Sequence, residues 1–241
     1  MIIDVDMGNS RLKWRSSNSL EQVHVCLDEN QAAQQWKALR GIARLRIASV
    51  VSDCRLQSLL TKVRKMLHLE AEVARVKDGF AGLHVAYADP SQFGVDRWLG
   101  LHAAKFQFPH ADLIYISAGT ALTVDYLAGS GQHLGGYIVP GWRLASEALL
   151  RGAAGINGFT PSLQNAWQPG SSTLDCVESG LGCMYGNFLR AVVQPDRAGF
   201  HPQLVIVSGG DAELRAALRA EQIRHTYAPA LVLDGLAVVL P

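Results

Sequence analysis

Short apolar blocks alternate with longer amphipathic blocks along most of the chain. The blocks Ile2–Val5, Leu45–Val50 and Glu72–Val76 have the length and the β-branched content of strands. Helical spacing of apolar residues is seen at 30–40, at 53–67, where Ser52 can serve as the N-cap, and at 95–105. Alternation of strands and helices in this manner predicts an α/β fold.

The first strand and its surroundings have a counterpart in the middle of the chain. IIDVDMGNSRLKW, at the start, compares with IYISAGTALTVDY at 114–126. Each is an apolar strand, a turn of small residues centred on Gly8 or Gly119, and a second strand, for which we expect Leu12–Arg15 in the first copy. A boundary near 106–110 then gives two similar domains, 1–107 and 108–241. Two like domains that face each other form a central cleft, where ligands usually bind.

A third turn of small residues follows the block LVIVSGGDAEL at 204–214. The strand ends at Ser208, and a helix is expected to start near Asp211. Gly209 and Gly210 would let a flat ligand or a phosphate approach the backbone near the helix N-terminus. An ordinary strand-to-helix turn explains the same residues, so this motif alone leaves both interpretations open.

Composition narrows the class of protein. Of 241 residues, 49% are hydrophobic and 18% are charged, which is typical of a globular chain, and a net charge of +1 argues against nucleic acid as a partner. The basic cluster Lys62, Arg64 and Lys65 suits the solvated face of a helix. No apolar stretch reaches the ~20 residues that span a bilayer. Since the first strand already begins at Ile2 and the four cysteines form no C-x-x-C pair, we expect a cytoplasmic protein with free thiols and no structural zinc.

The motifs present exclude several enzyme classes and favour phosphate chemistry. The chain has no P-loop, no G-x-S-x-G and no G-x-G-x-x-G. Asp6 ends its strand at the Gly8 turn, where it could hold Mg²⁺ directly or through water. Asn9, Ser10 and Lys13 could then contact phosphoryl oxygens. Asp4 lies on the same strand face as Asp6 and is interpreted as structural.

Six segments, in order, resemble the motifs of the type III pantothenate kinase family, over residues 2 to about 236. DMGNS resembles the first phosphate motif D-x-G-N-[ST], and SAGTALTVD the second, D-x-G-T-A-x-T-x-D. YADPSQFGVDR resembles the pantothenate motif Y-x-x-P-x-x-[LF]-G-x-D-R. HLGGYIVPG, STLDCVESG and VIVSGGDA resemble G-G-x-I-x-P-G, N-T-x-x-A-x-x-S-G and T-G-G-D-A. Each motif alone is weak, and the ordered set is specific.

This resemblance implies a fold, a reaction and a set of site residues. The fold is that of the actin-like, sugar-kinase and Hsp70 ATPase superfamily, with two ribonuclease H-like domains. The reaction is ATP- and Mg²⁺-dependent phosphorylation of pantothenate to 4'-phosphopantothenate, the first step of coenzyme A biosynthesis, with Asp96 as the general base. The resemblance assigns ATP to Asp6, Met7, Gly8, Asn9, Ser10, Lys13 and Thr120. It assigns pantothenate to Tyr87, Gly94, Val95, Asp96, Arg97 and Thr173, with Arg97 near the pantothenate carboxylate or a phosphate. The family is typically homodimeric.

The chain departs from the family pattern at one informative position. Ser117 stands where the family usually has an aspartate that helps to bind K⁺ or NH₄⁺. A neutral hydroxyl is a weaker cation ligand, so either the cation requirement is lost or backbone carbonyls hold the ion. Asp125, on the return strand, is equally well explained as a site residue or as a polar strand-end residue. Ser172 replaces the usual asparagine.

Two other functions are alternatives to pantothenate phosphorylation. One is a different kinase or phosphatase of the same superfamily, such as a sugar kinase, against which the intact YADPSQFGVDR argues. The other is a non-catalytic accessory factor for transcription, a role described for some relatives. Loss of Asp6 or Asp96 would favour that second function, and both residues are present.

Overall fold

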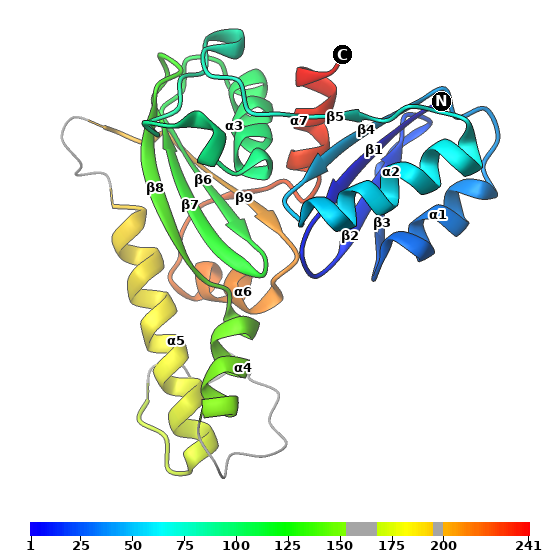
Figure 1. The fold of residues 1–241 in the computed structure, drawn as a ribbon. Helices are drawn as coiled ribbons and strands as arrows, with labels where there is room; N and C mark the ends of the chain where they lie inside the picture. Colours follow the sequence, from blue (N-terminus) through cyan, green and yellow to red (C-terminus); the bar gives the residue numbers. More distant parts are fainter. Residues whose placement is uncertain (153–167, 195–199) are drawn as a thin grey trace. The chain divides into compact units, whose positions relative to one another are not determined.

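The computed structural model describes residues 1–152, 168–194 and 200–241, which form two compact α/β units (Figure 1). The first unit comprises Met1–Pro109 and Ala230–Pro241, and the second comprises His110–Pro229. The chain therefore divides close to the predicted boundary. Residues 230–241, which sequence analysis assigned to the second domain, belong to the first unit instead.

The first unit is built on a five-stranded mixed sheet of order β3-β2-β1-β4-β5. Its elements in chain order are β1 (Ile2–Met7), β2 (Leu12–Ser16), β3 (Ser19–Cys26), α1 (Glu29–Lys37), β4 (Arg44–Ser49), α2 (Asp53–Leu67), β5 (Glu72–Val73), the 3₁₀ turns η1 (Phe80–Gly82) and η2 (Pro90–Gln92), α3 (Val95–Gln107) and α7 (Leu231–Val239). Strands β1 and β2 are antiparallel, whereas β1, β4 and β5 are parallel.

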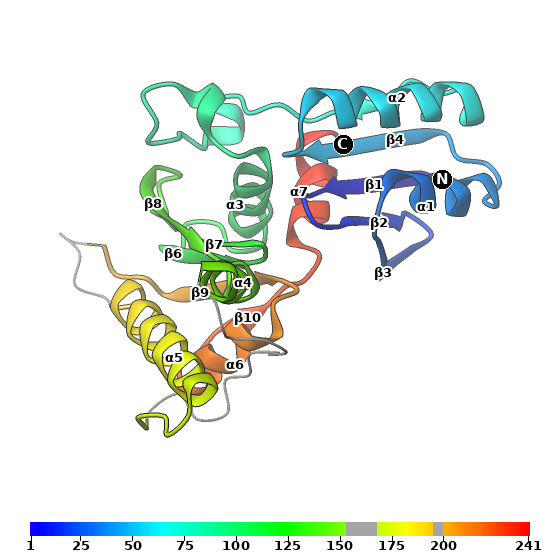
Figure 2. The ribbon, with the colours of Figure 1, turned by 60° about the horizontal axis from the view of Figure 1, so that its bottom comes forward.

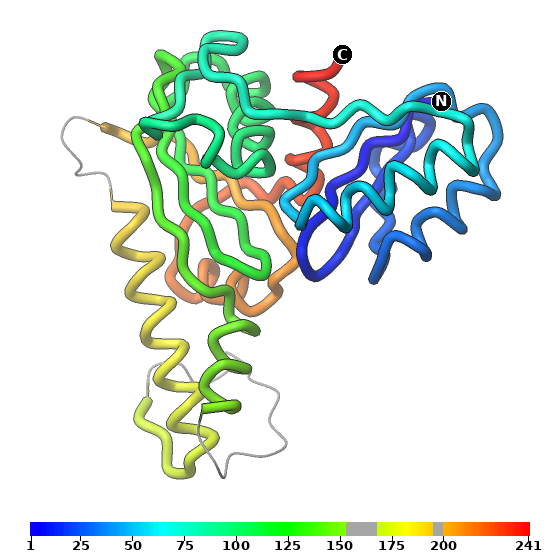
Figure 3. The backbone as a smooth tube through the Cα atoms, in the orientation of Figure 1, coloured from blue at the N-terminus to red at the C-terminus, as the bar shows by residue number. Residues whose placement is uncertain are grey.

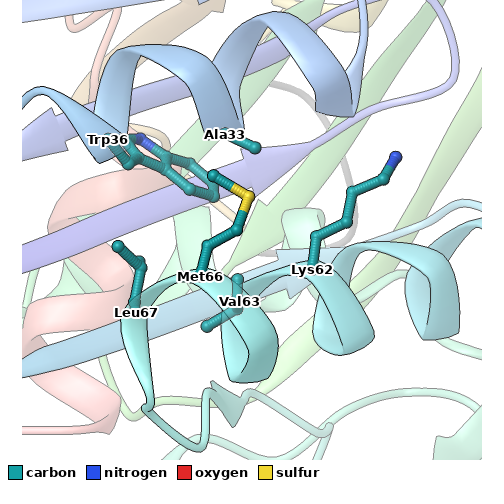
Figure 4. Close-up of a pocket in the computed structure, with 6 residues that line it drawn as sticks. All are labelled: Ala33, Trp36, Lys62, Val63, Met66 and Leu67. Atoms are coloured by element: carbon teal, nitrogen blue, oxygen red, sulfur yellow. The ribbon is translucent and has the colours of Figure 1, made fainter.

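The strict alternation of β1 gives its sheet one apolar face and one polar face. Ile3, Val5 and Met7 are fully buried in a core that α1 and α2 cover. Asp4 and Asp6 point to the opposite face, since successive side chains of a strand alternate. Figure 4 shows the seam between α1 and α2, where Met66 lies against Trp36 and the end of Lys62 turns away. This seam is lined almost wholly by apolar side chains, so it is a packing contact and not a ligand site.

Helix α7 covers part of the polar face. It packs against β1, β4 and α3, and it is almost wholly apolar, with Leu231, Leu233 and Leu236 buried (Figure 2). The chain leaves the first unit after α3 and returns to it only as α7, so both termini lie in this unit (Figure 3). An apolar helix at the end of a chain needs a partner surface, and the sheet of the first unit supplies it.

The second unit repeats the topology of the first. Its elements are β6 (Leu113–Ala118), β7 (Ala121–Leu127), β8 (His133–Pro140), α4 (Trp142–Gly152), α5 (Thr173–Val192), β9 (Leu204–Gly209), α6 (Ala212–Ala220) and β10 (Thr226–Tyr227). The sheet order is β8-β7-β6-β9-β10, the counterpart of β3-β2-β1-β4-β5, with the same parallel and antiparallel pairs. The predicted echo between the two halves is therefore a repeat of the whole sheet.

Three local expectations differ from the structure. The strand expected over Glu72–Val76 is confined to β5, an edge strand that pairs only with β4. Strand β3, which sequence analysis missed, is mostly exposed and so lacks an apolar signal. Ser52 occupies the N-cap position of α2, but its side chain makes no capping hydrogen bond.

Candidate functional site

Predicted site residues of the first unit meet where β1 ends and α3 begins. Asp6, near the end of β1, lies directly opposite Lys13 on β2 in the strand register. Asp96 lies in the first turn of α3, close enough for its charge to act on Asp6. We call Asp6, Lys13, Asp96 and the Gly8 turn the first half-site. The hairpin that carries Asp6 and Lys13 and the separate segment that carries Asp96 thus converge within one unit.

The Asp6 carboxyl has an unusual electrostatic environment. Burial is the main cause that raises its pKa to about 6, and the charge of Asp96 raises it further, while Lys13 opposes the shift. A desolvated acid beside a second acid is costly to keep ionised. A bound cation would relieve that cost, so this environment is typical of a functional site.

The turn after Asp6 is closed by the backbone and tied to a helix. The Gly8 N–H donates to the Arg11 carbonyl at 3.1 Å, which closes the β1–β2 hairpin. Arg55 on α2 donates to the Asn9 carbonyl at 3.2 Å and forms an ion pair with Glu29 at 2.7 Å. Asn9 and Ser10 are exposed at the tip. The turn therefore presents polar groups to solvent from an anchored backbone.

Met7, which the resemblance assigns to ATP, can offer a ligand only its backbone. Its side chain is fully buried in the core under α1 and α2, because it points to the opposite face from Asp6. Only its backbone is available to a ligand at the end of β1. The alternation of IIDVDM carries this information, since Met7 follows the apolar positions Ile3 and Val5.

The start of α3 is shaped around the Asp96 carboxylate. Oδ1 of Asp96 accepts a hydrogen bond from the Arg97 N–H at 2.9 Å, which fixes the orientation of the carboxylate. A Cβ on Gly94 would lie 2.7 Å from that same Oδ1, so a larger residue at this position would displace the carboxylate. The Gly-Val-Asp-Arg segment, which follows the 3₁₀ turn η2, thus begins α3 with an acid whose orientation is fixed.

Arg97 is enclosed by the aromatic residues of its own motif. Its side chain is buried, with Nη1 donating to the Tyr87 hydroxyl at 3.0 Å and the guanidinium carbon 4.6 Å from the centre of the Phe93 ring. Tyr87 and Phe93 themselves meet edge to face at 5.1 Å. In this structure Arg97 therefore stabilises the motif around Asp96 through packing and a hydrogen bond. Its side chain does not extend into solvent toward an anion.

A cavity of about 380 Å³ opens beside this motif, and sequence analysis did not foresee it. The residues that line it are Ser49, Val50, Ala74, Arg75, Val76, Ser91, Phe93, Gly94 and Val95. The lining is mainly apolar, with one cation, Arg75. Within the described part of the chain, the buried Oγ of Ser49 has no hydrogen-bond partner. Ser49 is the last residue of β4, which is parallel to β1. Ligands favour the carboxyl ends of parallel strands, so the position of Ser49 was the sequence signal that could have indicated this cavity.

In the second unit, three motif turns meet in direct backbone contact. The Gly141 N–H donates to the Thr120 carbonyl at 2.9 Å, and the Asp211 N–H donates to the Ala118 carbonyl at 3.0 Å. Gly209 has φ +96°, and a Cβ there would lie 2.1 Å from the Ala118 oxygen. We call these turns, at 118–120, 140–141 and 208–211, the second half-site. Glycines are required here because three backbone segments of the chain lie in van der Waals contact.

The remaining predicted residues of the second unit have distinct surroundings. Thr120 is exposed in the second half-site, and Thr173 is exposed in the first turn of α5, at the end of that helix away from the sheet (Figure 1). Ser117 lies between Thr123 and Ser208 in the strand register, so three hydroxyl residues stand side by side across the sheet. Asp125 is fully buried and pairs with Nε2 of His133 at 2.9 Å. This contact makes Asp125 part of the sheet interior.

The described residues contain neither a group of metal-ligating side chains nor a membrane-spanning helix. No three His, Cys, Asp or Glu side chains in 1–152, 168–194 and 200–241 gather as ligands for a metal ion. Over the same ranges, no helix combines the length and the apolar character that a membrane crossing takes.

Known proteins resemble this chain over nearly its whole length. Residues 2–195 match the family model described as type III pantothenate kinase. The chain is 36% identical to the type III pantothenate kinase of Cellvibrio japonicus, covering 99% of this chain and 96% of that one. It is 35% identical to that of Hahella chejuensis, covering 98% and 96%.

Solved structures show the same fold at lower identity. A Campylobacter jejuni protein assigned to the Baf family of transcriptional activators matches with a TM-score of 0.61 at 16% identity, over 99% of this chain and 96% of that one. The activator of 2-hydroxyisocaproyl-CoA dehydratase from Clostridium difficile, with bound ADPNP, matches with a TM-score of 0.52 at 10% identity, over 99% and 92%. These likenesses concern the fold alone.

Proposed function

Because the chain belongs to the type III pantothenate kinase family, we propose that it transfers the γ-phosphoryl group of ATP to the primary hydroxyl of pantothenate. The observation that carries this proposal is the electrostatic coupling of Asp6 and Asp96 beside the Gly8 turn. Phosphoryl transfer needs positioning and charge neutralisation more than covalent participation by the protein. The first half-site offers an acid for the acceptor and a polar turn for the phosphates.

Asp96 is the proposed general base. Its carboxylate would accept the proton of the acceptor hydroxyl as the new oxygen–phosphorus bond forms and the bond to the ADP oxygen breaks. The Arg97 N–H, which holds Oδ1 at 2.9 Å, keeps the carboxylate oriented for this step. Gly94 contributes by leaving room for that oxygen.

Asp6, Lys13 and the Gly8 turn form the proposed phosphate side. Backbone N–H groups and the hydroxyl of Ser10 would donate to phosphoryl oxygens, and Lys13 would offset their charge. The two coupled carboxylates suit Mg²⁺, and Asp6 would hold it directly or through water. When bound, Mg²⁺ would neutralise negative charge on the transferring group. In the second half-site, Thr120 and the glycine turns are the proposed contacts for the rest of ATP.

The cavity beside Gly94 is the proposed pocket for the acceptor. Pantothenate combines a carboxylate, an amide and a gem-dimethyl group, which makes it an amphipathic anion. The cavity matches this chemistry with apolar walls, the cation Arg75 and the buried hydroxyl of Ser49. Tyr87 and Arg97 would then stabilise the pocket wall through Phe93.

We further propose a homodimer in the cytoplasm. Strand β8 is an edge of the second sheet and exposes Leu134 and Ile138, the latter at 60%. An apolar, exposed edge is a favourable surface for a second copy. In such a dimer, Thr173 would contact pantothenate. The exposed free thiols of Cys54, Cys176 and Cys183 suit a reducing compartment. Light scattering after gel filtration tests the dimer, with Ile138→Asp expected to give monomers.

The direct test of the reaction is pantothenate-dependent ADP release. We expect turnover by the wild type and its loss, by at least about 100-fold, in Asp96→Asn. Nucleotide binding without any turnover would favour a non-catalytic function instead. Turnover with a sugar and not with pantothenate would favour another kinase of the superfamily.

A further inference from the structure

A cluster of buried charges lies on the same face of the sheet as Asp6, two residues earlier along β1. Asp4 lies opposite Arg15 on β2 and Arg46 on β4, so the three side chains share the polar face of the sheet. Oδ1 of Asp4 accepts from Nε of Arg46 at 2.7 Å, and Oδ2 is 3.3 Å from Nε of Arg15. All three residues are at most 5% exposed. We call Asp4, Arg15 and Arg46 the Asp4 cluster.

Both arginines of the cluster also hold the C-terminal helix. Nη1 of Arg15 pairs with Asp234, in the first turn of α7, at 2.5 Å. Nη1 of Arg46 donates to the carbonyl of Leu240, which follows the last turn, at 2.7 Å. The cluster therefore fixes α7 near both of its ends on the strand that carries Asp6.

A different side of α7 packs against α3. Gly235 packs so closely on α3 that a Cβ there would lie 2.2 Å from the backbone oxygen of Leu99. Leu99 is one turn along α3 from Asp96. A displacement of α7 must therefore displace the turn that presents the Asp96 carboxylate, since close-packed helices transmit shifts and do not absorb them.

Stability alone does not explain the Asp4 cluster. Buried ion pairs lose much of their attraction to desolvation, and apolar residues of similar volume are often as stable. Hydrogen-bonded charged groups differ from apolar ones in being directional. Here each guanidinium links the Asp4 carboxylate to one end of α7. The cluster thus fixes the position of the helix, in addition to covering the sheet.

We propose that Asp4 is a positioning residue for phosphoryl transfer, which holds Asp96 in register with Asp6 through Arg15, Arg46, α7 and Gly235. This inference rests on the proposed function, because it assumes that Asp6 and Asp96 act on the same transferring group. A misplacement of about 1 Å can cost roughly 100-fold in rate. Substrate affinity should change far less, because the Asp4 cluster is not among the proposed contacts of ATP or pantothenate.

The experiment compares Asp4→Asn with Gly235→Ala, which displaces α7 from its other side and leaves the cluster intact. The measurements are kcat and KM per folded molecule, at a temperature where circular dichroism shows each variant folded. We expect kcat to fall about 10- to 100-fold in each, with both KM values within about 3-fold of wild type. If the Asp4→Asn variant fails to fold, the Arg46→Lys variant is used in its place. The matched control is Glu70→Gln, which breaks the exposed Arg64–Glu70 pair and should leave kcat unchanged.

A second measurement separates this inference from the proposed function. Hydrogen exchange of the α3 amides at 98–101 should become faster in Asp4→Asn, whether or not the protein turns over pantothenate, while exchange in α1 stays as in wild type. An inactive wild type that still showed this change would overturn the proposed function and leave the link through α7 intact. A kcat within about 2-fold of wild type in both variants, or unchanged exchange in α3, would overturn the positioning role.

Discussion

Asp6 and Asp96 are ninety positions apart in the sequence, and yet the charge of Asp96 helps to raise the pKa of Asp6 to about 6. The pairing arises because β1 ends beside the first turn of α3, in a unit that the C-terminal helix completes. The charge of Asp96 makes Asp6 more costly to ionise in the free protein. Function and stability therefore conflict at this point, and the conflict can be measured.

Replacing Asp6 should stabilise the fold while it removes activity. A carboxyl with a folded pKa of about 6 and an ordinary value of 3.8 binds more protons when folded, so its contribution to stability falls as pH rises from 3.8 to 6. Asp6→Asn is thus expected to raise the free energy of unfolding at pH 7 by up to about 3 kcal/mol. Urea unfolding without Mg²⁺ or nucleotide measures this. A less stable Asp6→Asn protein at pH 7 would contradict the assigned environment.

His102 should make the protein sensitive to mild acid. It is buried in α3 between Phe80 and Trp98, and desolvation, with a smaller effect of Lys105, lowers its pKa to about 4. The unfolded chain then binds more protons between pH 6.5 and 4, so stability rises with pH through that window. We expect a loss of about 3 kcal/mol on going from pH 7 to 4 that is absent in His102→Leu. The exposed His201→Gln serves as control and should behave as wild type.

The cavity residues should affect acceptor binding and not the chemical step. Ser49→Ala removes a hydroxyl that has no partner among the described residues, so stability should be unchanged or higher. The KM for pantothenate should rise about 5-fold if that hydroxyl pairs with the substrate, since one hydrogen bond is worth about 1 kcal/mol.

Arg75→Gln tests the cation of the same cavity. We expect the KM for pantothenate to rise about 10-fold with kcat within about 2-fold, and the effect to shrink at high salt. Arg64→Gln, at an exposed ion pair outside the cavity, is the matched control. Unchanged KM values in both Ser49→Ala and Arg75→Gln would place the acceptor elsewhere.

Monovalent cations should matter little to this chain. Ser117, between Thr123 and Ser208 in register, supplies a neutral hydroxyl where the family usually has an acid. We expect turnover in Na⁺, K⁺ and NH₄⁺ buffers to agree within about 2-fold, since a serine is a poor cation ligand. A strict need for K⁺ or NH₄⁺ would mean that backbone carbonyls hold the ion.

Local chemistry made part of this account predictable from the sequence. The turns at Gly8 and Gly119 were identifiable because glycine and small polar residues mark them directly, and the repeat of the sheet followed. The alternation of apolar and acidic residues in IIDVDM also predicts that Met7 is buried. Such features depend on neighbours within a few residues.

Long-range packing accounts for what the sequence did not reveal. Arg15 and Asp234 form an ion pair across 219 positions, and neither residue carries a local signal of the other. For the same reason α7 was assigned to the second domain. The cavity at Ser49 and Arg75 exists only once β4, the segment after β5 and the Gly94 turn come together. Strand β3 was missed because an exposed strand has no apolar period to detect.

The central claim is that this chain phosphorylates pantothenate with Asp96 as the base. The most direct measurement is ADP release with and without pantothenate, for the wild type and for Asp96→Asn, by a detection method that does not depend on K⁺. The account predicts pantothenate-dependent turnover that falls at least about 100-fold in Asp96→Asn, with nucleotide binding retained. Pantothenate-dependent turnover that persists in Asp96→Asn, or none in a wild type that binds ATP, would contradict it.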